Sequence, residues 1–326
     1  MNLGTRTSRQ PLRAAWSRER LIHERAIALG NVIDKSTLSN YTSALNSYLN
    51  FVRLHDLPVQ PTPDTLSFYT VYMCFHINPR SVNTYLSGIS QQLEFHFPEV
   101  KEARNSPLVR RTLQGCMRLR GIATSRKRAL TIDDILLVID HYRHSTLHDD
   151  ILFVAMLITG FFGLLRLGEM TFPDDTSLHN WKKVIRRNTV RVLESQYEFL
   201  LPGHKADRFF EGNKIIIPAH RFRLHPGLHF SRYLSSQDAL HPIASPLWLT
   251  EAGFVPTRSF FIARLRQFFA SDVAGHSLRA GGATALAEHG VSPSIIQAAG
   301  RWASDAFLLY ICKNPTLLQG FLYTTS

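Results

Sequence analysis

The sequence lacks the usual signatures of metal and nucleotide chemistry. Its three cysteines lie far apart, which excludes a disulfide framework or a cysteine-rich zinc site and favours an intracellular, reducing compartment. Gly-x-Gly-x-x-Gly, P-loop and His-Glu-x-x-His motifs are all absent. His141, His144 and His148 approach metal-ligand spacing but straddle a predicted helix end, so a solvated connection is favoured. We therefore expect no metal, no nucleotide and no other cofactor.

Long hydrophobic runs are also missing. The most apolar stretch, residues 151–165, is too short to cross a bilayer and is followed by Arg166. The arginine-rich N-terminus has no apolar segment of the kind found in secretory signals. We expect no membrane partner, and we expect residues 151–165 to form a buried helix.

Positive charge, by contrast, is abundant and uneven. The 326 residues include 37 Lys and Arg against 25 Asp and Glu, a net charge of +12. Residues 1–128 hold 18 cationic and 8 acidic side chains, or +10, whereas residues 129–326 hold 19 and 17, or +2. A basic chain fits a polyanionic partner, and the first third is the better candidate for gripping phosphates. An ordinary solubilising surface is the alternative.

The length and the composition predict two domains. Residues 1–20 are Arg/Ser-rich without clear periodicity, and we expect residues 1–30 to form a mobile basic arm. Residues 31–123 contain four stretches of helical periodicity and predict a small bundle. The polar, basic residues 124–130 predict a linker that lies along DNA, with a plain solvated linker or a nuclear import signal as alternatives.

Residues 131–326 predict a second, mostly helical domain with a small antiparallel sheet. Thr131 and Asp134 have the spacing of a capping box. Alternating or β-branched runs predict three strands, at residues 184–193, 197–201 and 214–217. The polar residues 202–212 then form the tip of a hairpin. The fold class is mainly α with a small antiparallel β-sheet.

The most informative stretch lies near the C-terminus. His276 and Arg279 are three residues apart, on one face of a predicted helix, and are followed by Gly-Arg301-Trp302 and by Tyr310. Arg and His suit a phosphate oxyanion, and a Tyr hydroxyl can attack phosphorus. A core histidine beside a structural arginine would explain the first pair alone, but the downstream residues make the pattern specific.

Two further candidates precede this stretch. A Gly-rich turn after the buried helix carries Arg166, whose guanidinium can bind two phosphate oxygens, and Glu169 is placed to orient that turn. A surface ion pair is the alternative reading. Lys205 lies on the predicted hairpin tip and can act as a general acid if neighbours lower its pKa, with Arg208 and Lys214 as alternatives.

The order of these residues resembles the active-site signature of the tyrosine recombinases, or phage-type integrases. The resemblance implies a helical core-binding (SAM-like) domain followed by an α+β catalytic domain, clamped around double-stranded DNA. Tyr310 would attack the scissile phosphate to form a 3′-phosphotyrosyl link, and Lys205 would protonate the leaving 5′ oxygen. Arg166 and Arg279 would neutralise the transition state.

His276 and Trp302 would add hydrogen bonds to the same phosphate. Trp302 replaces the commoner histidine of the family, and its spacing to Tyr310 is eight rather than nine residues. Arg301 stands at nine, so either residue is a candidate for the phosphate contact.

The resemblance also implies DNA contacts and an assembly. The DNA-binding candidates are basic residues of the linker and of the helical domain: Arg126, Lys127, Arg128, Arg80, Arg110 and Arg111. Strand exchange would need a homotetramer on two DNA sites. We expect the protein to be intracellular, and to be nuclear if it comes from a eukaryote. Alternatives are a domesticated, catalytically silent DNA-binding protein, a type IB topoisomerase-like relaxer, and a helix-turn-helix protein reading DNA with Ser294 and Gln297.

Overall fold

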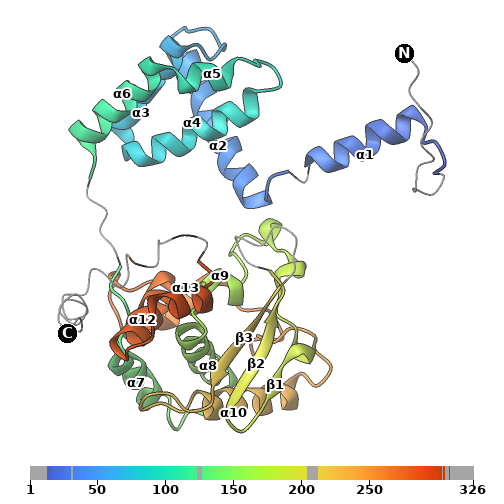
Figure 1. Cartoon of the computed structure of the whole chain (residues 1–326), viewed down its shortest axis with the longest axis vertical. Coiled ribbons are helices and arrows are strands. Elements are labelled where there is room, and N and C mark those ends of the chain that lie inside the picture. Colours follow the sequence, from blue (N-terminus) through green and yellow to red (C-terminus); the bar gives the residue numbers. More distant parts are fainter. Residues whose placement is uncertain are drawn as a thin grey trace. The chain divides into compact units, whose positions relative to one another are not determined.

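The chain divides into two units, residues 1–124 and 125–326, each with its own core (Figure 1). The computed structural model describes residues 13–30, 32–122, 127–203 and 212–302, together with Ser304 and Leu308. The sequence candidates Arg126, Lys205 and Tyr310 lie outside the described residues.

The first unit contains a bundle of four longer helices and one short helix. Proline stands at the start of three of them, after Thr62, Asn78 and Ser106, whose side-chain oxygens each accept a backbone N–H. The predicted four helices are present, and a short α5 is inserted before the last. The bounds are α2 Lys35–Leu54, α3 Pro63–His76, α4 Pro79–Leu93, α5 Val100–Asn105 and α6 Pro107–Arg120.

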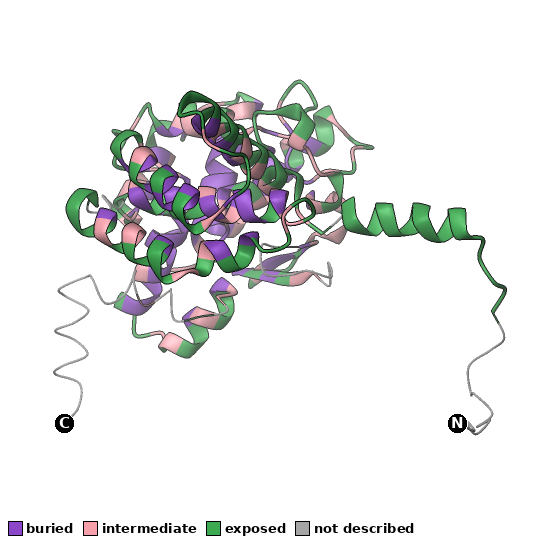
Figure 2. Cartoon of the chain, turned by 90° about the horizontal axis from the view of Figure 1, so that it is seen from above, coloured by how far each residue is buried: buried purple, intermediate pink, exposed green. Residues whose placement is uncertain are grey.

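A helix also forms inside the predicted arm. α1, Arg18–Gly30, buries none of its residues, and Figure 2 shows it exposed along its length. Sequence periodicity did not predict this helix, and the mobile basic arm at residues 1–30 stays a prediction. Arg, Glu, Leu and Ala all favour helix, so α1 forms from local propensity without the apolar face that periodicity detects.

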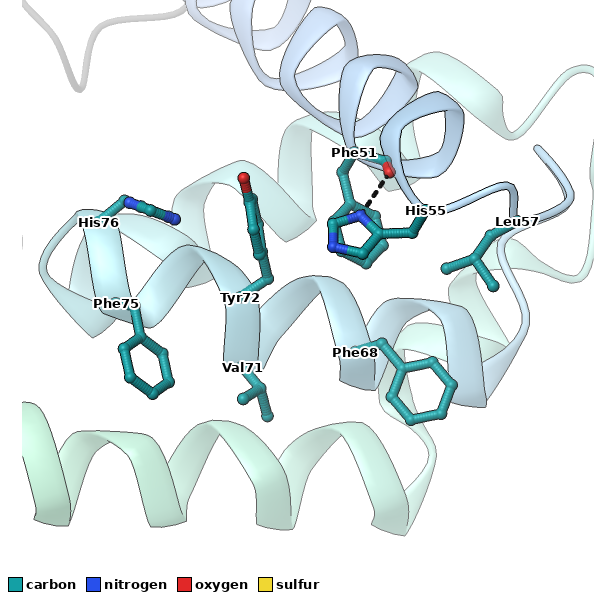
Figure 3. Close-up of a pocket in the computed structure, with 8 residues that line it drawn as sticks. All are labelled: Phe51, His55, Leu57, Phe68, Val71, Tyr72, Phe75 and His76. Carbon is teal, nitrogen blue, oxygen red and sulfur yellow. Dashed lines mark hydrogen bonds between the residues drawn. The ribbon is translucent and has the colours of Figure 1, made fainter.

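An apolar groove of about 670 Å³ lies over α2 and α3 of this unit (Figure 3). Phe68 and Phe75 line it and are more than half exposed, and the Arg120 guanidinium lies 3.4 Å from the centre of the Phe75 ring.

The second unit is built around the apolar helix α8, His148–Phe162, which contacts both α10 and α12. The strands follow the order β1-β2-β3, all antiparallel. The other bounds are α7 Ile132–His141, α9 Leu167–Met170, β1 Arg191–Val192, β2 Gln196–Leu201, β3 Asn213–Pro218, α10 Pro226–Leu240, α11 Arg258–Leu265, α12 Gly275–Glu288 and α13 Pro293–Gly300. Among the described residues, no helix is both long and apolar enough to cross a membrane.

Strands β2 and β3 pair on either side of the segment that the sequence predicts to be a hairpin tip. Tyr197 of β2 pairs with Ile217 of β3, and its ring stacks on Phe230 of α10 with centroids 4.0 Å apart. This buried face fixes the register of β2 and β3. The strands therefore lead directly into residues 202–212, the segment predicted to carry Lys205.

The first predicted strand, residues 184–193, is mostly not a strand. Only Arg191 and Val192 pair with β2, and residues 187–189 form a 3-10 turn. Residues 185–187 instead exchange backbone hydrogen bonds with residues 245–247. The alternation of apolar residues reflects burial against this neighbouring segment rather than pairing in a sheet.

Candidate active site

The site begins at the C-terminal end of α8. Leu164 has a φ of 49°, the left-handed conformation usually taken by glycine after a helix end. The N–H groups of Leu164 and Leu165 donate to the carbonyls of Phe161 and Gly160, which closes a Schellman cap. This cap reverses the chain and places Arg166 at the start of α9.

Arg166 and Glu169 form a compact ion pair within this turn. The Arg166 Nη1 donates to Glu169 Oε1 at 2.8 Å, and the Arg166 backbone N–H donates to Oε2 at 2.9 Å. The Glu169 side chain is only 7% exposed, so this is not a solvated surface pair. The carboxylate fixes both the backbone and the guanidinium of Arg166.

Helix α12 approaches α8 closely because it carries two consecutive glycines. A Cβ on Gly282 would lie 2.0 Å from the carbonyl oxygen of Phe161, and one on Gly281 would lie 2.1 Å from that of Leu130. This approach brings Arg279 against the end of α8. His276 lies one turn earlier on α12 and is exposed.

Arg279 is almost completely buried in this corner. Its Nη1 donates to the Leu164 carbonyl at 2.8 Å, and its Nη2 donates to the Gly300 carbonyl. The Trp302 ring covers one face of the guanidinium, 4.0 Å from Cζ to the ring centre. Arg279 is thereby held in one orientation by α8, by α13 and by an aromatic face.

The Gly300-Arg301-Trp302 segment explains how the tryptophan arrives there. Arg301 is left-handed, with a φ of 56°, and turns the chain back after α13. A Cβ on Gly300 would fall 1.6 Å from the Trp302 ring, so the ring lies directly on the glycine backbone. The three residues form one tight turn that folds Trp302 over Arg279.

Arg301 points inward rather than toward solvent. Its guanidinium donates to the carbonyls of Leu164 at 3.1 Å and Ala299 at 3.0 Å, and lies 3.4 Å from Glu169 Oε2. Burial lowers the pKa of Arg301, Glu169 opposes that shift, and Arg166 adds to it. The sequence left the phosphate contact open between Arg301 and Trp302. The terminal nitrogens of Arg301 donate to protein acceptors, whereas its buried Nε has no hydrogen-bond partner among the described residues. Trp302 lies half-buried beside Arg279.

These contacts form one continuous cluster. Glu169 joins Arg166 to Arg301, and the carbonyl of Leu164 joins Arg301 to Arg279. Three guanidinium groups and one carboxylate leave an excess of positive charge, which suits a phosphate. Sequence reasoning missed Leu164; its only signal was a leucine where a helix end favours glycine.

The DNA-binding candidates fall into two groups. Lys127 donates to the Ser271 carbonyl, and Arg128 pairs with Asp134 and Asp272, so both are tied to the second unit. The remaining candidates, Arg80 on α4 and Arg110 and Arg111 on α6, are exposed in the first unit.

The structure also shows where the histidines at metal-ligand spacing and the helix-turn-helix segment lie. His148 is buried, with its ring nitrogens hydrogen-bonded to Ser236 and Leu249, and no described cluster of three or more His, Cys, Asp or Glu residues is placed to hold a metal. The helix–turn–helix shape is present as α12, the turn at Gly290 and α13. Helix α12 of this motif carries Arg279, and Trp302 follows the end of α13.

The sequence matches no family model and no curated protein. Solved structures do match. The Tn1549 transposon integrase in complex with transposon right end DNA is 15% identical with a TM-score of 0.56, over 90% of this chain and 93% of that one. The XerH site-specific recombinase on palindromic difH DNA, a post-cleavage complex, is 15% identical with a TM-score of 0.55, over 80% and 71%.

A lambda integrase tetramer bound to a Holliday junction is 17% identical with a TM-score of 0.50, over 90% of this chain and 76% of that one. At this identity the matches show the fold. The chain has the tyrosine recombinase fold, mainly helical with a small antiparallel sheet.

Proposed function

We propose that this protein is a site-specific DNA recombinase that breaks and rejoins double-stranded DNA through Tyr310. One observation carries the proposal: Arg166 and Arg279 are held in a single cluster by Glu169, Arg301 and the Leu164 carbonyl. The guanidinium groups of Arg279 and Arg301 are buried, and buried charges are costly unless a function or a partner compensates. The matching folds of a transposon integrase and a recombinase on DNA add support.

In the proposed reaction, the Tyr310 oxygen attacks the scissile phosphorus and displaces the 5′ oxygen. Arg166 and Arg279 stabilise the negative charge of the transition state. His276 accepts the tyrosine proton and Trp302 donates a hydrogen bond to the phosphate, while Lys205 gives a proton to the leaving 5′ oxygen. One P–O bond replaces another, so rejoining needs neither metal nor ATP.

The proposed partner is double-stranded DNA, gripped through the basic first unit, with exposed Arg80, Arg110 and Arg111 on its surface. Strand exchange between two duplexes calls for four protomers. The matched lambda integrase tetramer on a Holliday junction supports this assembly.

Trapping of a covalent protein–DNA complex tests the proposal. The protein is incubated with nicked suicide duplexes carrying candidate sites, and a slower band is sought after denaturing electrophoresis. We expect a band that disappears in Tyr310→Phe and persists in the matched control Tyr323→Phe. Loss of the band in both variants, or in neither, would contradict the assignment of Tyr310.

Two other outcomes identify the alternative functions. Salt-sensitive DNA binding without any covalent band, across a panel of sites, would indicate a catalytically silent DNA-binding protein. A covalent band with relaxation of supercoils by a monomer, and no exchange of strands, would indicate a topoisomerase-like relaxer.

A further inference from the structure

We infer that Leu164 is a positioning residue for Arg279, and that its left-handed backbone is what aims the arginine. Only the expected effect on DNA cleavage rests on the proposed function; the contact between Leu164 and Arg279 does not. Leu164 touches no reacting atom; its carbonyl oxygen accepts from Arg279 Nη1 at 2.8 Å and from Arg301 Nη2 at 3.1 Å. One backbone oxygen thus holds two of the three arginines of the cluster.

The conformation of Leu164 decides where that oxygen points. In the Schellman cap the N–H groups of Leu164 and Leu165 return to α8, at Phe161 and Gly160. The positive φ rotates the following peptide away from the helix direction, so the Leu164 carbonyl leaves the α8 ladder and faces α12 and α13. A right-handed residue at this position would continue the helix and withdraw the acceptor.

The side chain explains why leucine occupies a place that favours glycine. Leu164 is 1% exposed and packs in an apolar cluster with Leu286 of α12 and Ile296 of α13. Its Cδ2 lies 2.6 Å from where a Cβ on Gly282 would stand, so α12 is shaped around it. The burial of leucine offsets the strain of the left-handed backbone, and the same residue fixes the helices that carry both arginines.

Two substitutions that keep the volume of the side chain but differ in backbone preference help to separate these two roles. Leu164→Ile keeps the volume and the apolar character but adds a β-branch, which strongly disfavours a positive φ. Leu164→Met keeps the volume without the branch. We expect the rate of covalent-complex formation to fall about tenfold in the isoleucine variant and to stay within about threefold in the methionine variant, with DNA affinity similar in both.

A double-mutant cycle measures the positioning without any cleavage assay. The loss of Tm caused by Leu164→Ile is compared in the wild-type and Arg279→Ala backgrounds, with Leu286→Ile as the control from the same apolar cluster. We expect the loss at Leu164 to shrink by about half when Arg279 is absent, and the loss at Leu286 to be unchanged. Additive losses at both positions would overturn the inference.

If the Leu164→Ile variant does not fold, the variants Leu164→Gly and Leu164→Ala are compared instead. Both remove the side chain, but only glycine adopts a positive φ without strain. We expect Leu164→Gly to cleave faster than Leu164→Ala, and an equal or slower rate would overturn the inference. If the wild-type protein forms no covalent complex, the proposed function fails, whereas the cycle still decides whether Leu164 holds Arg279.

Discussion

The two units bury polar groups in different ways. In the first unit the buried polar side chains are hydroxyls, and Thr70 and Ser90 simply bond to carbonyls of their own helices. In the second unit charged side chains are buried as well, including Arg279 and Glu198, and the side chains of Arg301 and Glu169 are 7% exposed. The described residues of the first unit combine an apolar core with hydrogen bonds of buried neutral groups, whereas those of the second unit also bury charged groups.

The difference indicates where function, rather than stability, shaped the fold. A buried charge must be compensated by partners or it destabilises the protein. Hydroxyls that bond within their own helix need no distant partner. Arg279, Arg301 and Glu169 gather at the end of α8, where the sequence predicts the candidate site, whereas Glu198 lies on β2 and pairs with Lys214. Four predictions test whether the contrast between the two units holds.

The largest expected effect follows from Arg301→Ala. This change leaves Glu169 and the Leu164 carbonyl short of a donor in a buried site, and we expect the free energy of unfolding to fall by about 3–5 kcal/mol. Arg266→Ala is the control, since Arg266 also donates to backbone carbonyls, those of Ala270 and Val273, but is exposed. We expect it to cost less than about 1.5 kcal/mol, as measured by chemical denaturation; equal losses would remove the contrast.

Glycine-to-alanine changes give opposite signs in the two units. In Gly282→Ala the new methyl group collides with the Phe161 carbonyl, and we expect a loss of about 1–3 kcal/mol. In Gly115→Ala, within α6, nothing beyond the adjacent residues and the backbone of the same helix lies within 4 Å of the new methyl group, so we expect a gain of about 0.5–1 kcal/mol. Thermal unfolding of the two variants checks the signs, and a stabilised Gly282→Ala would show that α12 does not pack directly on α8.

Acid should weaken the second unit through Asp134. Burial raises the pKa of Asp134, but hydrogen bonds from Arg128 and Thr131 outweigh burial and hold the pKa below its usual value. The stabilisation is therefore present above the unfolded pKa, near pH 4, and is lost as the pH falls through the lower folded value. We expect Asp134→Asn to lose about 1 kcal/mol at pH 7 and to converge with the wild type in strong acid, as followed by urea unfolding at several pH values.

The smallest effect is expected for Thr70→Val. The valine keeps the shape of threonine and removes a hydroxyl whose bond stays within α3, so we expect a change within about 0.5 kcal/mol. Ser277→Ala in α12 is the comparison, because the Ser277 hydroxyl accepts the Ala274 N–H at the helix start. Its loss should approach 1 kcal/mol. A larger cost at Thr70 would show that the first unit depends on buried polar bonds after all.

Sequence patterns predicted the elements that periodicity and caps encode. They placed α8, β2 and β3, the capping box of Thr131 and the turn with Arg166 and Glu169. They missed α1, which has no buried face, and misassigned residues 184–190, whose apolar alternation faces a loop. They also gave no sign that Arg279 and Arg301 share one acceptor, because a positive φ at a leucine depends on tertiary packing and leaves no periodic trace.

The shared carbonyl at the end of α8 has a consequence for how this site can vary. Because one peptide group orients two guanidinium groups, substitutions at Leu164, Arg279 and Arg301 are epistatic: the effect of each depends on which residues occupy the other two. Random single-site libraries would therefore find few improved variants there, whereas libraries that vary the three positions together sample the combinations in which a new turn and new side chains fit.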